Sequence, residues 1–160
     1  MARFPMTPRG QQALRDELKR LREVERPKNV CDIEEARAHG DLKENAEYHA
    51  AKERQSFIEG RSRDIESILA QAEVIDPGKL SGSRVVFGAT VRLADTDTGD
   101  EITYSIVGDH EADIKLGRIA ISAPLARAII GRESGETVTL RNAKGTREYQ
   151  IVEVRFEPQT

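Results

Sequence analysis

The sequence predicts an α+β protein: a long N-terminal antiparallel two-helix hairpin, then a small, mostly antiparallel sheet domain with one short helix. Val, Ile and Thr together number 9 in residues 1–76 and 23 in residues 77–160, and only 3 of the 12 glycines lie in the first part. Because β-branched side chains favour strands and glycines supply turns, the first part should be helical and the second should form the sheet. The turn-forming residues 76–79 (Asp-Pro-Gly-Lys) separate a predicted hairpin domain, 1–76, from a sheet domain, 80–160.

The first helix should begin at Thr7-Pro8, because threonine caps helices and proline is favoured in their first turn. Pro27 lacks a backbone donor and crowds the carbonyl four residues earlier, so we expect a kink there. Gly40 is the expected terminator. One apolar face at helical spacing comprises Leu14, Leu18, Leu21, Val30, Ile33 and Ala36.

The second helix is predicted from about residue 42 to residue 74, because its apolar positions alternate in steps of three and four, the spacing of a coiled-coil seam. The seam positions are Tyr48, Ala51, Gln55, Ile58, Ser62, Ile65, Leu69 and Ala72, of which Gln55 and Ser62 are polar and weaken the seam. Two helices of about 30 residues would each be roughly 45 Å long. Such a hairpin buries only one seam, so it serves either to reach a distant site or to hold an oligomer together, and the periodicity alone favours neither.

The second part of the sequence alternates short β patterns with turns, as an antiparallel sheet requires. A proline start and a glycine end predict the single short helix, Pro124 to Gly131. Asp97-Thr98-Gly99-Asp100 and Asn142-Ala143-Lys144-Gly145 are the predicted hairpin turns. The expected strands are residues 84–87, 90–93, 101–107, 119–121, 137–140 and 149–156.

The overall composition excludes several classes of protein. Charged residues make up 33% of the chain but the net charge is only -3, so it is not a generic basic nucleic-acid binder. A single cysteine, Cys31, excludes an internal disulfide and a thiolate zinc cluster, and we expect it to pack on the first helix. No apolar run approaches the roughly 18 residues of a membrane span, and the first residues lack a signal-peptide core. We therefore expect a cytoplasmic protein that does not bind membranes.

The turn between the two helices carries the main chemical candidates, Asp41 and Glu44. Their i,i+3 spacing fits a capping box, which spacing alone favours. Alternatively, the two carboxylates are ligands for Mg²⁺, which usually takes one or two protein carboxylates and completes its shell elsewhere. A zinc site from His39, Asp41 and His49 is the weakest alternative, since it has no thiolate and no paired-histidine spacing.

Basic residues lie close to the same end of the hairpin. They are Arg37, Lys43, Lys52 and Arg54. Such side chains are either ordinary solvated charges or contacts to a phosphate backbone, where they position a nucleic acid without reading its sequence. The chain contains no phosphate-binding glycine motif and no recognisable nucleophile motif.

Residues 34–51 (EEARAHGDLKENAEYHAA) resemble the signature of the Gre family of bacterial transcript cleavage factors. The resemblance continues in residues 74–76 (VID), 87–91 (FGATV), 111–113 (EAD) and 124–131 (PLARAIIG), so it covers essentially the whole chain. It implies a coiled-coil hairpin and an FKBP-like C-terminal domain. It also implies an accessory factor, not itself an enzyme, that binds RNA polymerase through its secondary channel and stimulates cleavage of backtracked nascent RNA.

The resemblance also implies roles for individual residues. Asp41 and Glu44 would be catalytic ligands of a Mg²⁺ shared with the polymerase active site and not bound stably by the factor alone. The basic residues that would contact the 3′ end of the nascent RNA are Arg37, Lys52 and, on a weaker match, Arg54. The residues that would dock on the polymerase are Ser122, Pro124 and Arg127. We expect the free factor to be monomeric.

One position departs from the family pattern, because Ala123 stands where the family usually has a serine before the short helix. If that hydroxyl helps docking, Ser122 would have to compensate, so the departure bears on affinity for polymerase. Gre homologues that inhibit polymerase also exist. A secondary-channel regulator without cleavage activity is therefore the alternative function, and a stand-alone metal-dependent nuclease is a weaker one.

Overall fold

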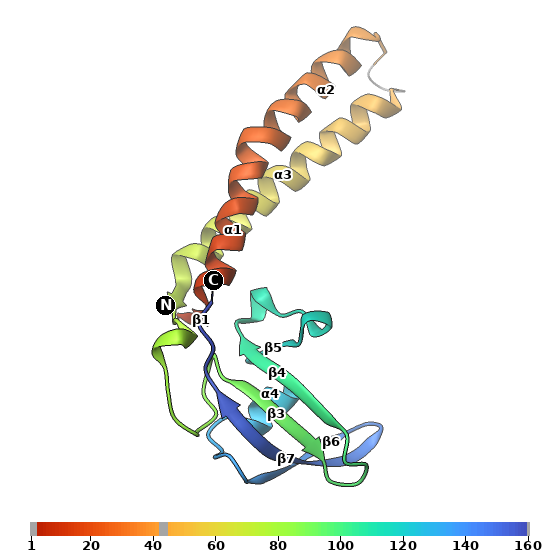
Figure 1. The fold of residues 1–160 in the computed structure, drawn as a ribbon. Coiled ribbons are helices and arrows are strands. Elements are labelled where there is room, and N and C mark those ends of the chain that lie inside the picture. Colours follow the sequence, from red (N-terminus) through yellow and green to blue (C-terminus); the bar gives the residue numbers. More distant parts are fainter. Residues whose placement is uncertain (1–2, 42–44, 160) are drawn as a thin grey trace. The chain divides into compact units, whose positions relative to one another are not determined.

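The computed structural model describes residues 3–41 and 45–159 of the 160-residue chain. It has the predicted α+β architecture, with a helical hairpin and a curled sheet (Figure 1). The chain forms two compact units: a hairpin unit, Gln12–Gln71, and a sheet unit that combines Ala72–Thr160 with the residues up to Gln11. The predicted hairpin domain of residues 1–76 includes segments that belong to the sheet unit by contact.

The first arm of the hairpin consists of α1 (Pro8–Arg20), a π-helical turn η1 (Leu21–Glu25) and α2 (Arg26–Ala38). The predicted start is confirmed, because the Gly10 amide donates to the Thr7 hydroxyl at 3.2 Å, which is an N-cap bond. The predicted end is confirmed as well. Gly40 follows α2 with φ of +99°, a conformation that glycine adopts without a steric penalty.

The π turn shifts the buried face of the first arm by one residue. Leu14, Leu18 and Leu21 are buried as predicted, but Val30 is 47% exposed, so its predicted place in the seam is wrong. Asn29 is buried instead, and Ile33 and Ala36 follow it. A π turn contains one residue more than an α turn. Beyond it, the positions that face the other arm therefore come one residue later in the sequence than an unbroken α-helix would place them. It lies just before Pro27, where the sequence predicts a kink.

The second arm is a single helix, α3 (Ala46–Gln71). Its predicted seam is confirmed, with Ala51, Ile58, Ser62 and Ile65 buried. Ser62 is tolerated there because its hydroxyl donates to the Ile58 carbonyl at 2.7 Å. The predicted extension of the helix to residue 74 is wrong.

Residues after Gln71 form a strand, β2 (Ala72–Val74), which pairs in parallel with β1 (Phe4–Met6). This two-stranded ribbon belongs to the sheet unit. It joins the segment before the hairpin to the segment after it.

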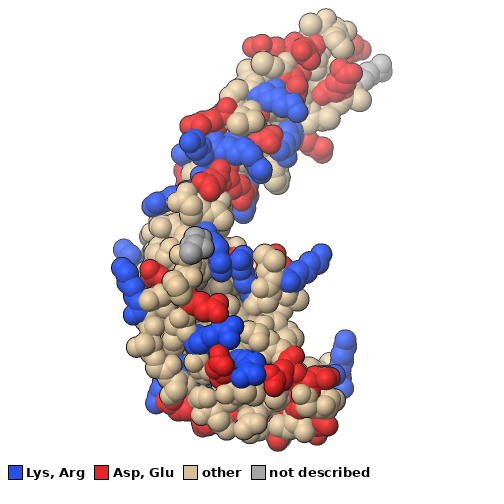
Figure 2. Space-filling view, in the orientation of Figure 1, with Lys and Arg blue, Asp and Glu red and all other residues tan. Residues whose placement is uncertain are grey.

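Ion pairs join the arms of the hairpin along its length. Both Glu17 oxygens accept from Arg61, at 2.6 and 2.9 Å. Further pairs are Arg22–Glu66, Arg26–Glu59 and Arg54–Glu25. On the face shown in Figure 2, Lys and Arg side chains gather over the middle of the hairpin with Asp and Glu side chains on both sides of them. The outer faces are thus highly charged with mixed sign, as the composition predicts.

The sheet unit contains a five-stranded mixed sheet in the order β5-β4-β3-β7-β6. Its strands are β3 (Thr90–Asp95), β4 (Glu101–Val107), β5 (Arg118–Ala120), β6 (Thr137–Asn142) and β7 (Gly145–Arg155). Among the described strands of this five-stranded sheet, β4 and β5 pair in parallel and the other neighbours pair antiparallel, so the mostly antiparallel prediction is confirmed. The 3₁₀ turns are η2 (Pro77–Lys79), η3 (Asp109–Glu111) and η4 (Ile114–Leu116).

The core of the sheet unit lies between the sheet and the short helix α4 (Pro124–Ile129). Ala126 and Ile129 of α4 are fully buried in the same cluster as Leu93, Ile106 and Ile151 of the strands. The predicted strand 84–87 is wrong, since only one bridge, Arg84 to Glu133, forms there. Its apolar residues nevertheless belong to the core, with Val85 fully buried. No helix among the described residues is both long enough and apolar enough to cross a bilayer.

Candidate functional site

The candidate site is the turn that joins α2 to α3, which comprises residues 39–45 and which we call the tip. Asp41 is described and exposed. Glu44, the other predicted carboxylate ligand, lies outside the described residues, as do Leu42 and Lys43. Residue 42, the predicted start of the second helix, is therefore not described, and the described helix begins at Ala46.

Asn45 organises the described part of the tip. Its side-chain oxygen accepts from the Tyr48 amide at 3.0 Å, which makes Asn45 the N-cap of α3. Its side-chain nitrogen donates to the Ala36 carbonyl at 2.6 Å and so ties the start of α3 to the end of α2. The capping alternative for the carboxylates requires Asp41 to be the N-cap, and the structure gives that role to Asn45.

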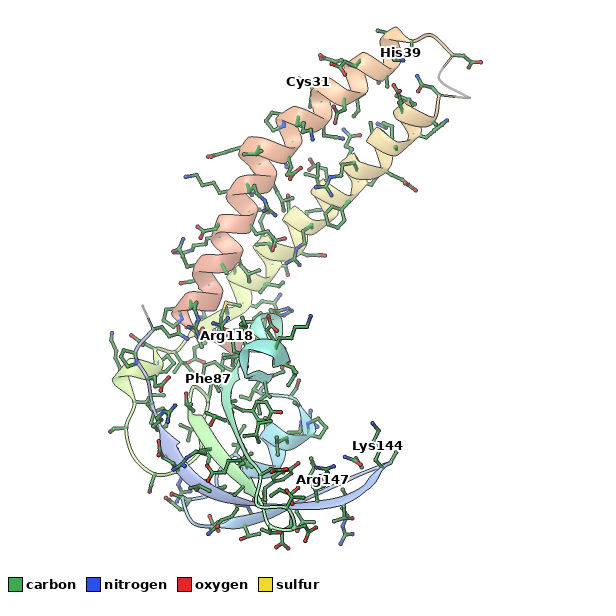
Figure 3. All side chains as sticks on the ribbon, turned by 45° about the vertical axis from the view of Figure 1, so that its right-hand side comes forward. Cys31, His39, Phe87, Arg118, Lys144 and Arg147 are labelled. Atoms are coloured by element: carbon green, nitrogen blue, oxygen red, sulfur yellow. The ribbon has the colours of Figure 1, made fainter. Side chains whose placement is uncertain are left out.

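The two histidines near the tip, His39 and His49, make separate local contacts. His39, labelled at the end of α2 in Figure 3, places Nδ1 3.4 Å from the carboxylate of Glu47. The His49 ring packs edge-on against the Tyr48 ring, with centroids 5.7 Å apart. Among the residues that the structure describes, no three His, Cys, Asp or Glu side chains are close enough to hold a metal. The zinc alternative built on His39, Asp41 and His49 therefore has no geometric support.

The predicted RNA-contacting residues lie on both arms. Arg37 is exposed in the last turn of α2. Lys52 is exposed on α3 and donates to Gln55 Oε1 at 2.8 Å. Arg54 pairs with Glu25 at 3.2 Å, so that its guanidinium is held on the surface of the hairpin.

A shallow hollow lies on the outward face of α3, beginning at its first residue. Its lining is small or polar: Ala46, His49, Ala50, Lys52, Glu53 and Ser56. Phe57 follows directly in sequence, 54% exposed, with the Arg54 guanidinium carbon 5.0 Å from the centre of its ring. The sequence prediction did not include Phe57, although one aromatic residue on an otherwise charged helical face was a visible signal.

The predicted polymerase-docking residues lie at α4 in the sheet unit. Ser122 donates through its hydroxyl to Asp109 at 2.7 Å, so this hydroxyl is engaged within the chain. Ala123 caps α4 without a side-chain bond, as expected for a residue without a hydroxyl. Pro124 begins the helix, and Arg127 is exposed in its last turn.

Cys31 is exposed on α2, so the prediction that it packs within the hairpin is wrong (Figure 3). The buried positions of α2 are Asn29, Ile33 and Ala36, and Cys31 lies between them on the outer side of the helix.

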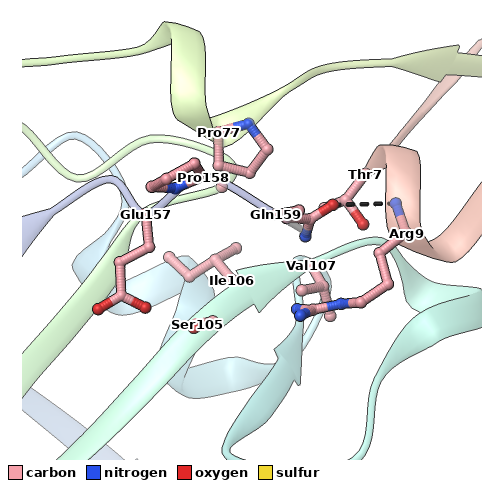
Figure 4. Close-up of a pocket in the computed structure, with 10 residues that line it drawn as sticks. Thr7, Arg9, Pro77, Ser105, Ile106, Val107, Glu157, Pro158 and Gln159 are labelled. Atoms are coloured by element: carbon pink, nitrogen blue, oxygen red, sulfur yellow. Dashed lines mark hydrogen bonds between the residues drawn. The ribbon is translucent and has the colours of Figure 1, made fainter.

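A small cavity of about 50 Å³ lies in the sheet unit and is shown in Figure 4. It is lined by Pro77, Ile106 and Pro158, beside the Arg9 amide, which donates to Gln159 at 2.9 Å. A cavity of this size has room for about one or two water molecules. It is too small to be the binding site of a nucleotide or a peptide.

Two family models match the chain. The model described as "Transcription elongation factor, N-terminal" matches residues 4–74. The model described as "Transcription elongation factor, GreA/GreB, C-term" matches residues 80–156.

Curated relatives cover nearly the whole chain. One named transcription elongation factor GreA, from Anaeromyxobacter sp. strain K, is 59% identical over 98% of this chain and 94% of its own. Another of the same name, from Xanthomonas axonopodis pv. citri, is 61% identical over 96% and 98%. Among solved structures, GreA factor homolog 1 of Thermus thermophilus is 26% identical over 96% of this chain and 99% of its own, with a TM-score of 0.43.

Proposed function

The chain belongs to the GreA/GreB family of transcription elongation factors, and we propose that it stimulates RNA polymerase to cleave its own backtracked nascent RNA. It is an accessory factor rather than an enzyme, as its relatives' names indicate. The proposed partner is RNA polymerase, whose secondary channel the hairpin would enter. The nascent RNA 3′ end is the proposed second contact, and we propose a cytoplasmic protein that is monomeric when free.

The observation that carries this proposal is the cap at the tip. Because Asn45 caps α3, the helix needs no capping oxygen from Asp41. The side-chain amide of Asn45 also donates to the Ala36 carbonyl and so ties the start of α3 to the end of α2. A hairpin that ends in two acidic residues beside an independent cap is suited to present carboxylates to a partner.

Asp41 and Glu44 are the proposed metal ligands. Carboxylate oxygens suit Mg²⁺, which usually keeps several waters and takes one or two protein carboxylates. The described residues hold no cluster of three potential ligands, so such an ion would draw its other ligands from polymerase or RNA. When bound, Mg²⁺ stabilises charge on the attacking and leaving oxygens of a phosphodiester.

The other predicted residues have supporting roles in this proposal. Arg37 and Lys52 are exposed on either arm and suit contacts to RNA phosphates, which position the RNA without reading its sequence. Pro124 and Arg127 at α4 are the proposed docking residues. Ser122 is less suited to replace the missing family serine, since its hydroxyl already donates to Asp109.

The test is a cleavage assay with purified backtracked polymerase, Mg²⁺ and the full-length factor. Asp41→Asn and Glu44→Gln should each lower the stimulated rate strongly. A loss of 10³-fold would correspond to about 4 kcal/mol of transition-state stabilisation. Glu47→Gln is the matched control, because it makes the same change of charge at an exposed carboxylate in the first turn of α3. That variant should keep nearly full stimulation.

Two further measurements separate the alternatives. Binding of each variant to polymerase should stay within about threefold of wild type, because the changed groups act at the tip. A wild-type factor that binds polymerase without shortening the RNA would support the secondary-channel regulator instead. Incubation with RNA and Mg²⁺ without polymerase should give no cleavage, and cleavage there would support a stand-alone nuclease.

A further inference from the structure

The turn between β5 and α4 is held by one acidic side chain from another part of the sheet unit. Asp109, in the 3₁₀ turn η3, accepts two hydrogen bonds from Ser122 through a single carboxylate oxygen. The Ser122 hydroxyl donates to Asp109 Oδ1 at 2.7 Å, and the Ser122 amide donates to the same atom at 3.3 Å. The side chain and the backbone of Ser122 are therefore both fixed in direction, by bonds to a charged acceptor.

η3 provides a fixed support for Asp109. The carboxylate of Glu111 accepts from the Gly108 amide at 3.0 Å and from the Thr7 amide at 2.8 Å. The Glu111 amide in turn donates to the Gly108 carbonyl at 3.0 Å, which closes the turn. Because η3 is bonded both within itself and to the segment before α1, which belongs to the same unit, Asp109 can hold Ser122 in place.

The helix that follows the Ser122 turn has no side-chain cap of its own. Ala123 is the N-cap residue of α4 and makes no side-chain bond, since alanine has no oxygen to accept one. The helix has only six residues, Pro124–Ile129, and a helix this short has little stability alone. The Arg127 amide closes its first turn by donating to the Ala123 carbonyl at 3.0 Å. The start of α4 therefore depends on what holds the residue just before Ala123.

The same turn and helix carry the proposed docking residues, Ser122, Pro124 and Arg127, all of which are exposed. Pro124 and Arg127 are three positions apart, so they lie on one side of α4. A partner can contact these side chains together only when α4 begins where it does in this structure. A free factor in which the start of α4 is open would bind more weakly, in proportion to the fraction that is closed.

We propose that Asp109 is a positioning residue for docking on RNA polymerase, because its carboxylate fixes Ser122 and so takes over the task of the missing cap at Ala123. In this role Asp109 acts through Ser122 and does not contact the polymerase. The inference rests on the proposed function for the identity of the partner. The competing role is a direct ionic contact between Asp109 and the polymerase, which the exposure of this side chain permits.

The first measurement is the affinity of the full-length factor for purified RNA polymerase, by titration calorimetry. Asp109→Ala should raise Kd about tenfold, as expected if the start of α4 is closed in about one tenth of the variant molecules. Asp109→Asn keeps an oxygen that accepts from Ser122, so its Kd should stay within about threefold of wild type. A direct ionic contact would make both variants equally weak, because both lose the charge, and this result would overturn the proposal.

A matched control and a kinetic readout accompany the affinities. Asp97→Ala makes the same change at an exposed residue in the turn after β3, and it should bind as wild type. In the cleavage assay, Asp109→Ala should raise the half-maximal factor concentration about tenfold and leave the rate at saturation unchanged, because it changes only the docking-competent fraction. A lower rate at saturation with unchanged affinity would contradict a docking role.

Ala123→Ser supplies the missing cap and separates positioning from contact. If Asp109 and a cap at residue 123 perform the same task, the serine should lower Kd about fivefold in the Asp109→Ala background but less than twofold in the wild-type background. A serine that contacts the polymerase directly would give the same gain in both backgrounds, and that outcome would refute the shared task.

A further readout needs no polymerase. Amide hydrogen exchange at Arg127 should be about tenfold faster in the free Asp109→Ala factor and slow again when Ala123→Ser is added. Amides of β3, in the middle of the sheet, should keep their protection, which shows that the unit still folds. Unchanged exchange at Arg127 would show that Asp109 does not hold the helix. A wild-type factor that binds polymerase without shortening its RNA would refute the proposed function and leave the comparison of affinities valid.

Discussion

Replacing Asn45 by alanine should loosen the tip of the hairpin while leaving the rest of the fold in place. The change removes two interactions, the cap on the Tyr48 amide and the bond to the Ala36 carbonyl. An N-cap contributes about 1 kcal/mol, and a side-chain bond to a backbone carbonyl contributes a similar amount. The sum, about 2 kcal/mol, corresponds to roughly a 30-fold increase in local opening.

The measurement is amide hydrogen exchange at His49, whose N–H donates to the Asn45 carbonyl at 3.1 Å in the first turn of α3. Exchange there should be roughly 30-fold faster in Asn45→Ala, because the turn opens more often. Asn45→Asp keeps the capping oxygen and loses only the amide donor, so its exchange should be about fivefold faster. Amides near Ile65, far along the helix, should be unaffected in both variants.

Function should follow the same order. If the tip must be held for its carboxylates to act, cleavage stimulation should fall more in Asn45→Ala than in Asn45→Asp, with polymerase binding unchanged. An alanine variant with wild-type exchange at His49 would show that Asn45 does not hold the turn. Equal exchange in the two variants would show that the amide donor alone matters.

Four further substitutions test the packing within each unit. Asn29→Ala should lower the free energy of unfolding by about 2 kcal/mol in urea titrations, because it removes a buried amide that donates to a carbonyl of the other arm at 2.9 Å. Arg61, through its hydrogen bond, holds the pKa of Glu17 below its usual value, so this pair stabilises the fold at neutral pH and the stabilisation is lost as the pH falls through the lowered pKa. Unfolding measured between about pH 5 and about pH 3 should therefore show a smaller pH dependence in Glu17→Gln. Gly60→Ala should stabilise by about 0.5–1 kcal/mol because nothing lies within 4 Å of the added carbon, whereas Gly10→Ala should destabilise because its Cβ would overlap the carboxylate of Glu111.

The second arm could be predicted closely because one local rule governs it. An unbroken α-helix repeats its faces in steps of three and four, so the spacing of Ile58, Ser62 and Ile65 directly identifies the buried side. The first arm obeys the same rule only up to Leu21. A π turn forms where backbone amides bond the carbonyl five residues earlier instead of four. The spacing of apolar residues in the sequence does not indicate which of these hydrogen bonds forms.

Pairing between distant segments could not be predicted from the sequence either. Residues 72–74 continue a helical pattern, yet they form β2 because β1 offers a partner at residues 4–6. Local propensity carries no information about a strand more than 60 residues away. The β-branched segment 84–87 shows the converse, since it has strand composition but finds only one bridging partner.

The candidate site was located from the sequence, but its organisation was not. The run around Asp41 and Glu44 pointed to the tip through its spacing and its resemblance to a family. Spacing alone favoured a capping role for Asp41, because a cap and a metal ligand use the same carboxylate chemistry. The structure gives the N-cap of α3 to Asn45, which depends on where α3 begins, and the metal-ligand role of Asp41 stays a prediction.

The ribbon of β1 and β2 limits how the length of the hairpin can change during evolution. Each strand has only three residues, and a one-residue slip would turn Met6, which is 1% exposed, to the opposite face. An inserted or deleted residue in either arm must therefore be absorbed between the ribbon and the tip. The π turn of the first arm accommodates one residue in this way while Ile33 and Ala36 stay buried. Related sequences with a one-residue deletion in this region should have an ordinary α turn there and still bury the residues that match Ile33 and Ala36.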